Sequence, residues 1–176
     1  MNKNEKYMFV LCGFPASGKS TIAKKINAII PCNILSMDAY RNPLEDGGLS
    51  QEDNGKVFAI FRNAIEKSVK RNQNIIVDAL NLKAQNRKYY MKLTKDKEYK
   101  HICIFIDCDI ETCMKNNRNK DRTHIVPNSY YEKIKNRGSK PILDEGWDEI
   151  YIIKINYNDN KITIIENKKK GEEIKW

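Results

Sequence analysis

The feature that most constrains this chain is a glycine-bearing segment near its N-terminus, Gly13-Phe14-Pro15-Ala16-Ser17-Gly18-Lys19-Ser20. An apolar run at residues 8–12 precedes it, and a helix-period segment at residues 19–30 follows it. Glycines let the backbone turn tightly and point its N–H groups at phosphate oxygens, and the following helix adds the positive end of its dipole. The chain is therefore predicted to begin with a strand, a phosphate-binding loop and a helix.

This loop predicts which residues bind a nucleotide. Lys19 should reach the β- and γ-phosphates of ATP, and the Ser20 hydroxyl should be a Mg²⁺ ligand. ATP and Mg²⁺ are therefore the expected cofactors. The residues predicted to contact the nucleotide are Gly13, Pro15, Ala16, Ser17, Gly18, Lys19, Ser20 and Thr21.

Apolar runs alternate with helix-period segments along the rest of the chain, which predicts an α/β fold. We expect a doubly wound P-loop kinase fold of about five parallel strands with flanking helices and a basic lid. A chain of 176 residues is the size of one domain, so residues 1–176 are predicted to form a single unit. The lid is expected at about residues 118–137, and a hairpin with a tail at about residues 157–176. The predicted strands are residues 8–12, 33–37, 75–77, 102–106 and 150–155.

The composition indicates which binding partners and which cellular location to expect. No apolar run approaches the roughly 18–20 residues that span a bilayer, and the polar N-terminus lacks a signal-peptide pattern. We therefore expect a cytoplasmic protein with no membrane partner. The five cysteines include no Cys-x-x-Cys pair, which argues against a metal or disulfide role. The net charge of +9 fits either a nucleic-acid partner or a general preference for lysine, and the oligomeric state stays open.

Asp38 and Arg41 follow the second predicted strand. In an open parallel sheet, ligands lie outside the carboxyl ends of the strands. An aspartate there can accept the proton of an attacking hydroxyl, and an arginine one turn later can hold a phosphate of the acceptor. The other interpretation is that Asp38 caps a short helix. The phosphate loop favours the catalytic interpretation.

Two aspartates are candidates for the metal shell. Asp78 ends the third predicted strand and Asp107 ends the fourth, and both strands are predicted to lie beside the first. We favour Asp78, because Asn81 and Arg87, which follow it, also look functional. Asp107 could instead cap the next helix.

Arg118 and Arg122 are spaced i, i+4, so both face one side of a continuing helix. Phosphoryl transfer needs cations that neutralise charge on the γ-phosphate, and a basic lid closing over ATP would supply them. The alternative is a solvated helix face.

Together, four segments over about residues 8–155 resemble the kinase domain of 5′-hydroxyl polynucleotide kinases, which phosphorylate free DNA or RNA ends. They occur in the order of that family. They are the phosphate loop through Thr21, Asp38-x-x-Arg41, Asp78-Ala79-Leu80-Asn81 with Arg87, and Asn116-Asn117-Arg118 to Arg122 followed by Pro127, Pro141 and Glu145-Gly146-Trp147.

The resemblance implies roles for these residues. Asp38 would be the general base toward the 5′-hydroxyl, and Arg41 would contact the phosphate next to it. Arg118 and Arg122 would close on the donor. The chain departs from the family pattern where Leu80 replaces a threonine and where Trp147 replaces a phenylalanine.

We therefore expect an ATP-dependent kinase that transfers the γ-phosphate to the 5′-hydroxyl of DNA or RNA. The phosphate loop and the Asp-x-x-Arg motif also occur in kinases of tRNA, nucleosides and other small molecules, so such an acceptor is the alternative. A regulatory nucleotide-binding switch is the weaker alternative. Asn119-Lys120-Asp121 misses the Asn-Lys-x-Asp guanine motif by one position, and Asp-x-x-Gly is absent from the sequence.

Overall fold

A six-stranded sheet forms the centre of the molecule. The computed structural model describes residues 5–40, 54–94, 97–119, 125–136, 138–159 and 161–171. The strand order is β2-β3-β1-β4-β5-β6. The strands are β1 (Lys6–Cys12), β2 (Asn33–Ser36), β3 (Ile75–Asp78), β4 (Tyr99–Ile106), β5 (Glu149–Asn156) and β6 (Lys161–Lys169).

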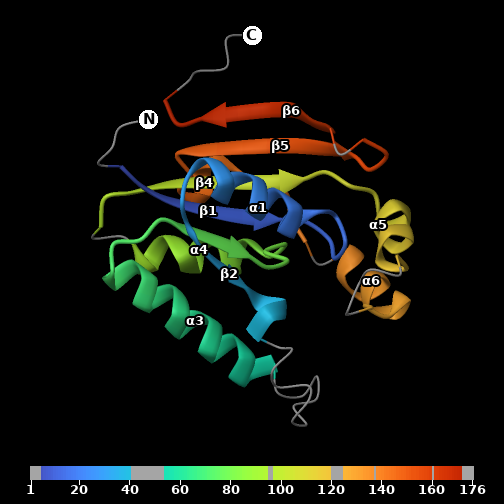
Figure 1. The fold of residues 1–176 in the computed structure, drawn as a ribbon, viewed down its shortest axis with the longest axis horizontal. Helices are drawn as coiled ribbons and strands as arrows, with labels where there is room; N and C mark the ends of the chain where they lie inside the picture. Colours follow the sequence, from blue (N-terminus) through green and yellow to red (C-terminus); the bar gives the residue numbers. More distant parts are fainter. Residues whose placement is uncertain are drawn as a thin grey trace.

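Five of the six strands run parallel. β1 pairs with β3 and β4, β3 pairs with β2, and β4 pairs with β5, all in parallel register. β6 runs antiparallel to β5 at the edge of the sheet (Figure 1). The predicted parallel α/β sheet is confirmed, but the predicted hairpin begins earlier than residue 157. Its first arm is β5 itself, because the backbone of β6 completes the open edge of that strand.

Helices cover both faces of the sheet (Figure 1). On one face, Ile22 and Ala23 of α1 pack with Phe9 of β1. On the other face, α3 and α4 pack against the alternate residues of β1, such as Met8. Side chains alternate between the two faces of a strand, so an apolar β1 buries both. The helices are α1 (Lys19–Ile29), α3 (Asn54–Lys70), α4 (Ala84–Leu93), α5 (Ile110–Asn117) and α6 (Asn128–Lys135), with a 3₁₀ turn η2 (Leu143–Glu145).

α5 and α6 lie beyond the carboxyl end of β4 (Figure 1). The Asp109 carboxylate caps α5 by accepting from the Thr112 N–H at 2.7 Å, so Asp109 and not Asp107 fills the capping position. Of the predicted lid, residues 118–119 and 125–136 are described, and residues 120–124 and 137 lie outside the described part. None of the described helices is long and apolar enough to cross a membrane.

Candidate active site

The phosphate loop connects β1 to α1 at the carboxyl end of a central strand. Gly18 has a left-handed φ of 93° at the N-cap of α1, a conformation that glycine adopts without steric cost. A Cβ on Gly13 would lie 2.8 Å from the Ser17 Oγ and 3.2 Å from the Ile106 carbonyl oxygen. The loop therefore needs glycine at both positions to take this shape.

Three side chains from distant elements hold the loop from outside. Tyr131, Asn116 and Tyr157 donate hydrogen bonds to the carbonyl oxygens of residues 15, 16 and 17, at 3.2, 3.3 and 3.1 Å respectively. Tyr131 belongs to α6, Asn116 to α5, and Tyr157 follows β5. No local sequence pattern predicts these three contacts, because each residue lies 100 or more positions away from its partner.

Lys19 is buried within this loop. Its Nζ donates to the carbonyl oxygens of Gly13 at 3.1 Å and Phe14 at 2.6 Å. Burial lowers the pKa of Lys19, while the nearby charges of Asp78 and Asp38 raise it. Within the described part of the chain, no carboxylate forms an ion pair with this ammonium. A buried cation of this kind fits the phosphates of a nucleotide, which would supply the missing negative charge.

Ser20 and Asp78 form the candidate metal position. The Ser20 Oγ donates to the Asp78 Oδ2 at 2.7 Å, and Asp78 is buried at the end of β3. Burial raises the pKa of Asp78, and the hydrogen bond from Ser20 and the charge of Lys19 only partly offset this. A divalent cation would favour the ionised carboxylate here.

The donor set fits Mg²⁺ bound together with a nucleotide. The described residues include no group of three or more His, Cys, Asp or Glu side chains that could hold a metal alone. Mg²⁺ is commonly held by one or two protein ligands plus substrate phosphates, which matches a hydroxyl and one carboxylate. Asp107 lies elsewhere: it lines a different hollow, and its carboxylate is 4.0 Å from the Lys140 Nζ.

One cavity of about 530 Å³ brings four of the predicted catalytic and metal-binding residues together. Lys19, Ser20, Asp38 and Asp78 all line it. Asp38 is exposed and lies within a helical turn, residues 37–40, directly after β2. The loop residues in the wall are Pro15, Ala16, Gly18 and Thr21, and the remaining lining includes Met37, Phe58, Leu80, Asn81, Asn86, Asn116, Asn119, Tyr130 and Tyr157.

The structure does not place the predicted arginines at the cavity. Arg118 ends α5 as its C-cap with an exposed side chain, and it does not line the cavity, although Asn116 and Asn119 beside it do. Arg41 and Arg122 lie outside the described residues.

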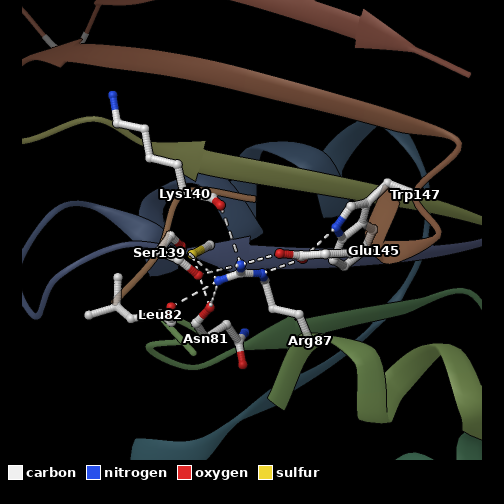
Figure 2. Close-up of polar contacts among 8 residues, drawn as sticks. Asn81, Leu82, Arg87, Ser139, Lys140, Glu145 and Trp147 are labelled. Carbon is white, nitrogen blue, oxygen red and sulfur yellow. Dashed lines mark hydrogen bonds and ion pairs between the residues drawn. The ribbon is translucent and has the colours of Figure 1, made fainter. Parts of the chain in front are cut away.

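Arg87 is fully buried, and Figure 2 shows its polar contacts. Its Nη1 donates to the carbonyl oxygens of Asn81, Leu82 and Ser139, each at 2.9 Å. Its Nε and Nη2 pair with the Glu145 carboxylate. Arg87, which looked functional from the sequence, therefore ties three chain segments together inside the fold. Asn81 does line the cavity, and its Nδ2 donates to a β1 carbonyl at 2.7 Å.

Glu145 is the second centre of this buried cluster. It also accepts from the Trp147 Nε1 at 3.0 Å, and Trp147 is fully buried (Figure 2). Burial raises the pKa of Glu145, but the hydrogen bonds from Arg87 and Trp147 lower it more, so the pKa lies below its ordinary value. The charge of each partner is compensated within the fold.

Comparison with known families agrees with this architecture. Residues 8–140 match the AAA domain family AAA_33. The chain belongs to this AAA domain family. A KTI12 homolog from Oryza sativa subsp. indica is 25% identical over 152 residues, which are 80% of this chain and 50% of the rice protein. The chain thus spans about half the length of the curated relatives it matches.

Solved structures share the fold of this AAA domain. A putative kinase from Chloroflexus aurantiacus has a TM-score of 0.71 at 16% identity, with 91% of each chain covered. Chaetomium thermophilum Kti12 in complex with ADP-AlF3 has a TM-score of 0.59 at 19% identity, with 88% of this chain and 91% of that chain covered. A chain of the Pnkp1/Rnl/Hen1 RNA repair complex has a TM-score of 0.61 at 20% identity, with 76% of this chain and 45% of that chain covered. The shared architecture is a P-loop, kinase-like nucleotide-binding fold.

Proposed function

We propose that this AAA domain is an ATP-dependent phosphotransferase that passes the γ-phosphate to a hydroxyl of a small molecule, a nucleoside or a tRNA. One observation carries the proposal: Lys19, the Ser20–Asp78 pair and Asp38 all line a single cavity at the carboxyl ends of parallel strands. This is where open α/β sheets bind their ligands.

Each residue has a distinct task in the proposed reaction. Lys19 would hold the β- and γ-phosphates, and Ser20 and Asp78 would hold Mg²⁺, which supplies positive charge against the charge on the transferred phosphoryl group. Asp38 would accept the proton of the acceptor hydroxyl as it attacks. The exposed position of Asp38 in the cavity wall supports this role, because a substrate can reach it.

Phosphorylation of 5′-hydroxyl ends of DNA or RNA is the second candidate. It is favoured by the resemblance of Asp38-x-x-Arg41 and Asp78-Ala79-Leu80-Asn81 to polynucleotide kinases, and by the fold match to a chain of an RNA repair complex. Two rice relatives are KTI12 homologs, which supports the broader acceptor class. A regulatory nucleotide-binding protein is a third candidate, in which ATP would be hydrolysed without an acceptor.

The decisive experiment is transfer of labelled γ-phosphate from ATP to a panel of acceptors, namely nucleosides, sugars, tRNA and 5′-hydroxyl oligonucleotides. We expect a labelled product with at least one acceptor of the first three classes. Label found only in free phosphate would support the regulatory protein, and label found only on oligonucleotide ends would support the second candidate.

Asp38→Asn tests the proposed chemistry within this panel. We expect turnover to fall by roughly 10²–10⁴-fold, the usual contribution of a positioned general base, with little change in ATP affinity. The conservative amide keeps the size of the side chain, so ATP affinity serves as the control for folding. A loss confined to ATP binding would contradict the role of Asp38.

A further inference from the structure

A second hollow of about 320 Å³ adjoins the cavity just described. It lies between residues 80–86, which follow β3, and helix α6. The two hollows share Leu80, Asn81, Asn86 and Tyr130 in their walls. A ligand in the first cavity can therefore extend into the second without leaving the protein surface.

The two hollows differ in charge. The first contains the carboxylates of Asp38 and Asp78. The second is lined by two lysines, Lys83 and Lys133, and none of its lining residues is acidic. Two ammonium groups without a carboxylate between them favour a bound anion, and phosphate is the anion that lysine commonly binds as a point charge.

The remaining wall of the second hollow is apolar and aromatic. Leu80, Leu82 and Ile134 line it together with the ring of Tyr130. Aromatic and aliphatic side chains of this kind suit the flat face of a nucleobase. The lining thus combines a surface for a base with charges for a phosphate.

The floor of this hollow is fixed by the fold. The Leu82 carbonyl accepts from the Arg87 guanidinium at 2.9 Å and from the Ser139 N–H at 2.9 Å. A Cβ on Gly138 would lie 3.0 Å from the Leu82 Cβ, which shows how closely the two segments approach. A wall held in this way is preorganised, so little conformational entropy is lost when a ligand binds.

We infer that the second hollow is an acceptor subsite that binds the phosphate of a nucleotide whose hydroxyl lies at Asp38. This inference rests on the proposed phosphotransferase function and narrows its acceptor to a phosphate-bearing nucleotide unit, free or at the end of an RNA chain. Lys83 and Lys133 bind the phosphate, and the apolar wall beside Tyr130 contacts the base.

The test compares Lys83→Ala/Lys133→Ala with Lys92→Ala/Lys135→Ala. The control pair removes two exposed lysines from the same two helical segments, and neither of them lines the second hollow. Phosphoryl transfer from ATP is measured with a nucleoside, the matching nucleoside 3′-monophosphate and a 5′-hydroxyl oligoribonucleotide. Binding of the nucleoside 3′-monophosphate to ADP-saturated protein is measured separately by calorimetry.

We expect wild type to prefer the phosphate-bearing acceptors. The subsite variant should raise their KM about ten- to hundred-fold, leave the nucleoside and ATP unaffected, and weaken binding in calorimetry by a similar factor. An effect on the mononucleotide places a free nucleotide in the hollow, whereas an effect on the oligoribonucleotide alone places an RNA end there. The control pair should match wild type.

Calorimetry separates the failure of this inference from the failure of the proposed function. If no acceptor is phosphorylated but the nucleotide still binds and the subsite variant loses that binding, the subsite stands and the phosphotransferase function falls. If nucleotide binding is absent, or is equal in wild type and the subsite variant, the inference is wrong whatever the transfer assay shows. Equal KM changes for the nucleoside and the nucleotide would also overturn it.

Discussion

Lys19 and Arg87 are the two buried cations among the described residues, and their surroundings are opposite. The Arg87 guanidinium pairs with the Glu145 carboxylate and donates to backbone carbonyls on two further segments. The Lys19 ammonium donates to two carbonyls of its own loop, and burial lowers its pKa. Both side chains are held in place, but only one has its charge neutralised by a hydrogen-bonded carboxylate.

The presence or absence of a paired carboxylate distinguishes a buried cation that stabilises the fold from one that binds a ligand. Removing a charge from water costs free energy unless a partner charge compensates it. Arg87 has this compensation in the folded chain, so its contribution is to stability. Lys19 lacks this compensation and lines the cavity. A bound phosphate would therefore be the partner that neutralises its charge. Burial of a cation is therefore informative only together with the identity of its partners.

Substitution of Lys19 gives the largest expected effect. We predict that Lys19→Met abolishes phosphoryl transfer, by about 10³-fold or more, because it removes the cation on the transferring phosphates. The free energy of unfolding should stay equal or rise, since a desolvated charge is lost. Transfer assays and urea unfolding check the two parts, with Lys24→Met, an exposed position on α1, as the control. Retention of more than about a tenth of the activity would mean that the loop is not the donor site.

Substitution of Arg87 should have the opposite effect to substitution of Lys19, because it should lower stability. We predict that Arg87→Met lowers the free energy of unfolding by about 3–5 kcal/mol, because Glu145 is left buried without its partner. Urea unfolding with a fixed slope measures the change. Lys88→Met, at the next and exposed position of α4, is the control. A loss below about 1 kcal/mol would show that Glu145 is solvated or otherwise paired.

The pH dependence of stability should report the same ion pair. The pKa of Glu145 is lower in the folded chain than in the unfolded chain, where it is about 4.3. The stabilisation is therefore fully present above that pH and is lost as the pH falls through the folded pKa. Unfolding should become easier below about pH 4 in wild type, and this acid sensitivity should be smaller in Glu145→Gln. Parallel pH profiles of the two proteins would argue against an ionised Glu145.

The smallest effect is expected at the edge of the Arg87 cluster. The Arg87 Nη2 donates to the Ser139 Oγ at 3.1 Å, and this residue is exposed to solvent. Ser139→Ala should lower the free energy of unfolding by about 0.5–1 kcal/mol, because the other hydrogen bonds of Arg87 remain and water replaces the hydroxyl. Thermal unfolding beside Ser129→Ala, an exposed serine of α6, measures it. A loss as large as that of Arg87→Met would mean that the cluster acts as a single unit.

Local patterns predicted the parts of the molecule that depend on neighbours in sequence. The phosphate loop between β1 and α1 is set by glycines and an apolar run within a few residues, so it could be predicted. The role of Arg87 could not, because its partners Ser139 and Glu145 lie 52 and 58 positions away. The contact of Tyr157 with the Ser17 carbonyl, 140 positions away, could not be predicted for the same reason. The pairing of β6 with β5 as a sheet edge was missed because most residues of β6 are exposed, so no buried face marks this strand as part of the sheet.

The three side chains that bond to the phosphate loop also determine when, during synthesis of the chain, the loop can reach its final structure. Ribosomes make the loop before its partners Asn116, Tyr131 and Tyr157, which follow 100 to 140 positions later. At about 5–20 residues per second, the delay is roughly 5–28 s. Until then the loop carbonyls would bond to water instead of to these side chains. We therefore expect a nascent chain with the complete motif to bind ATP poorly until translation has passed Tyr157.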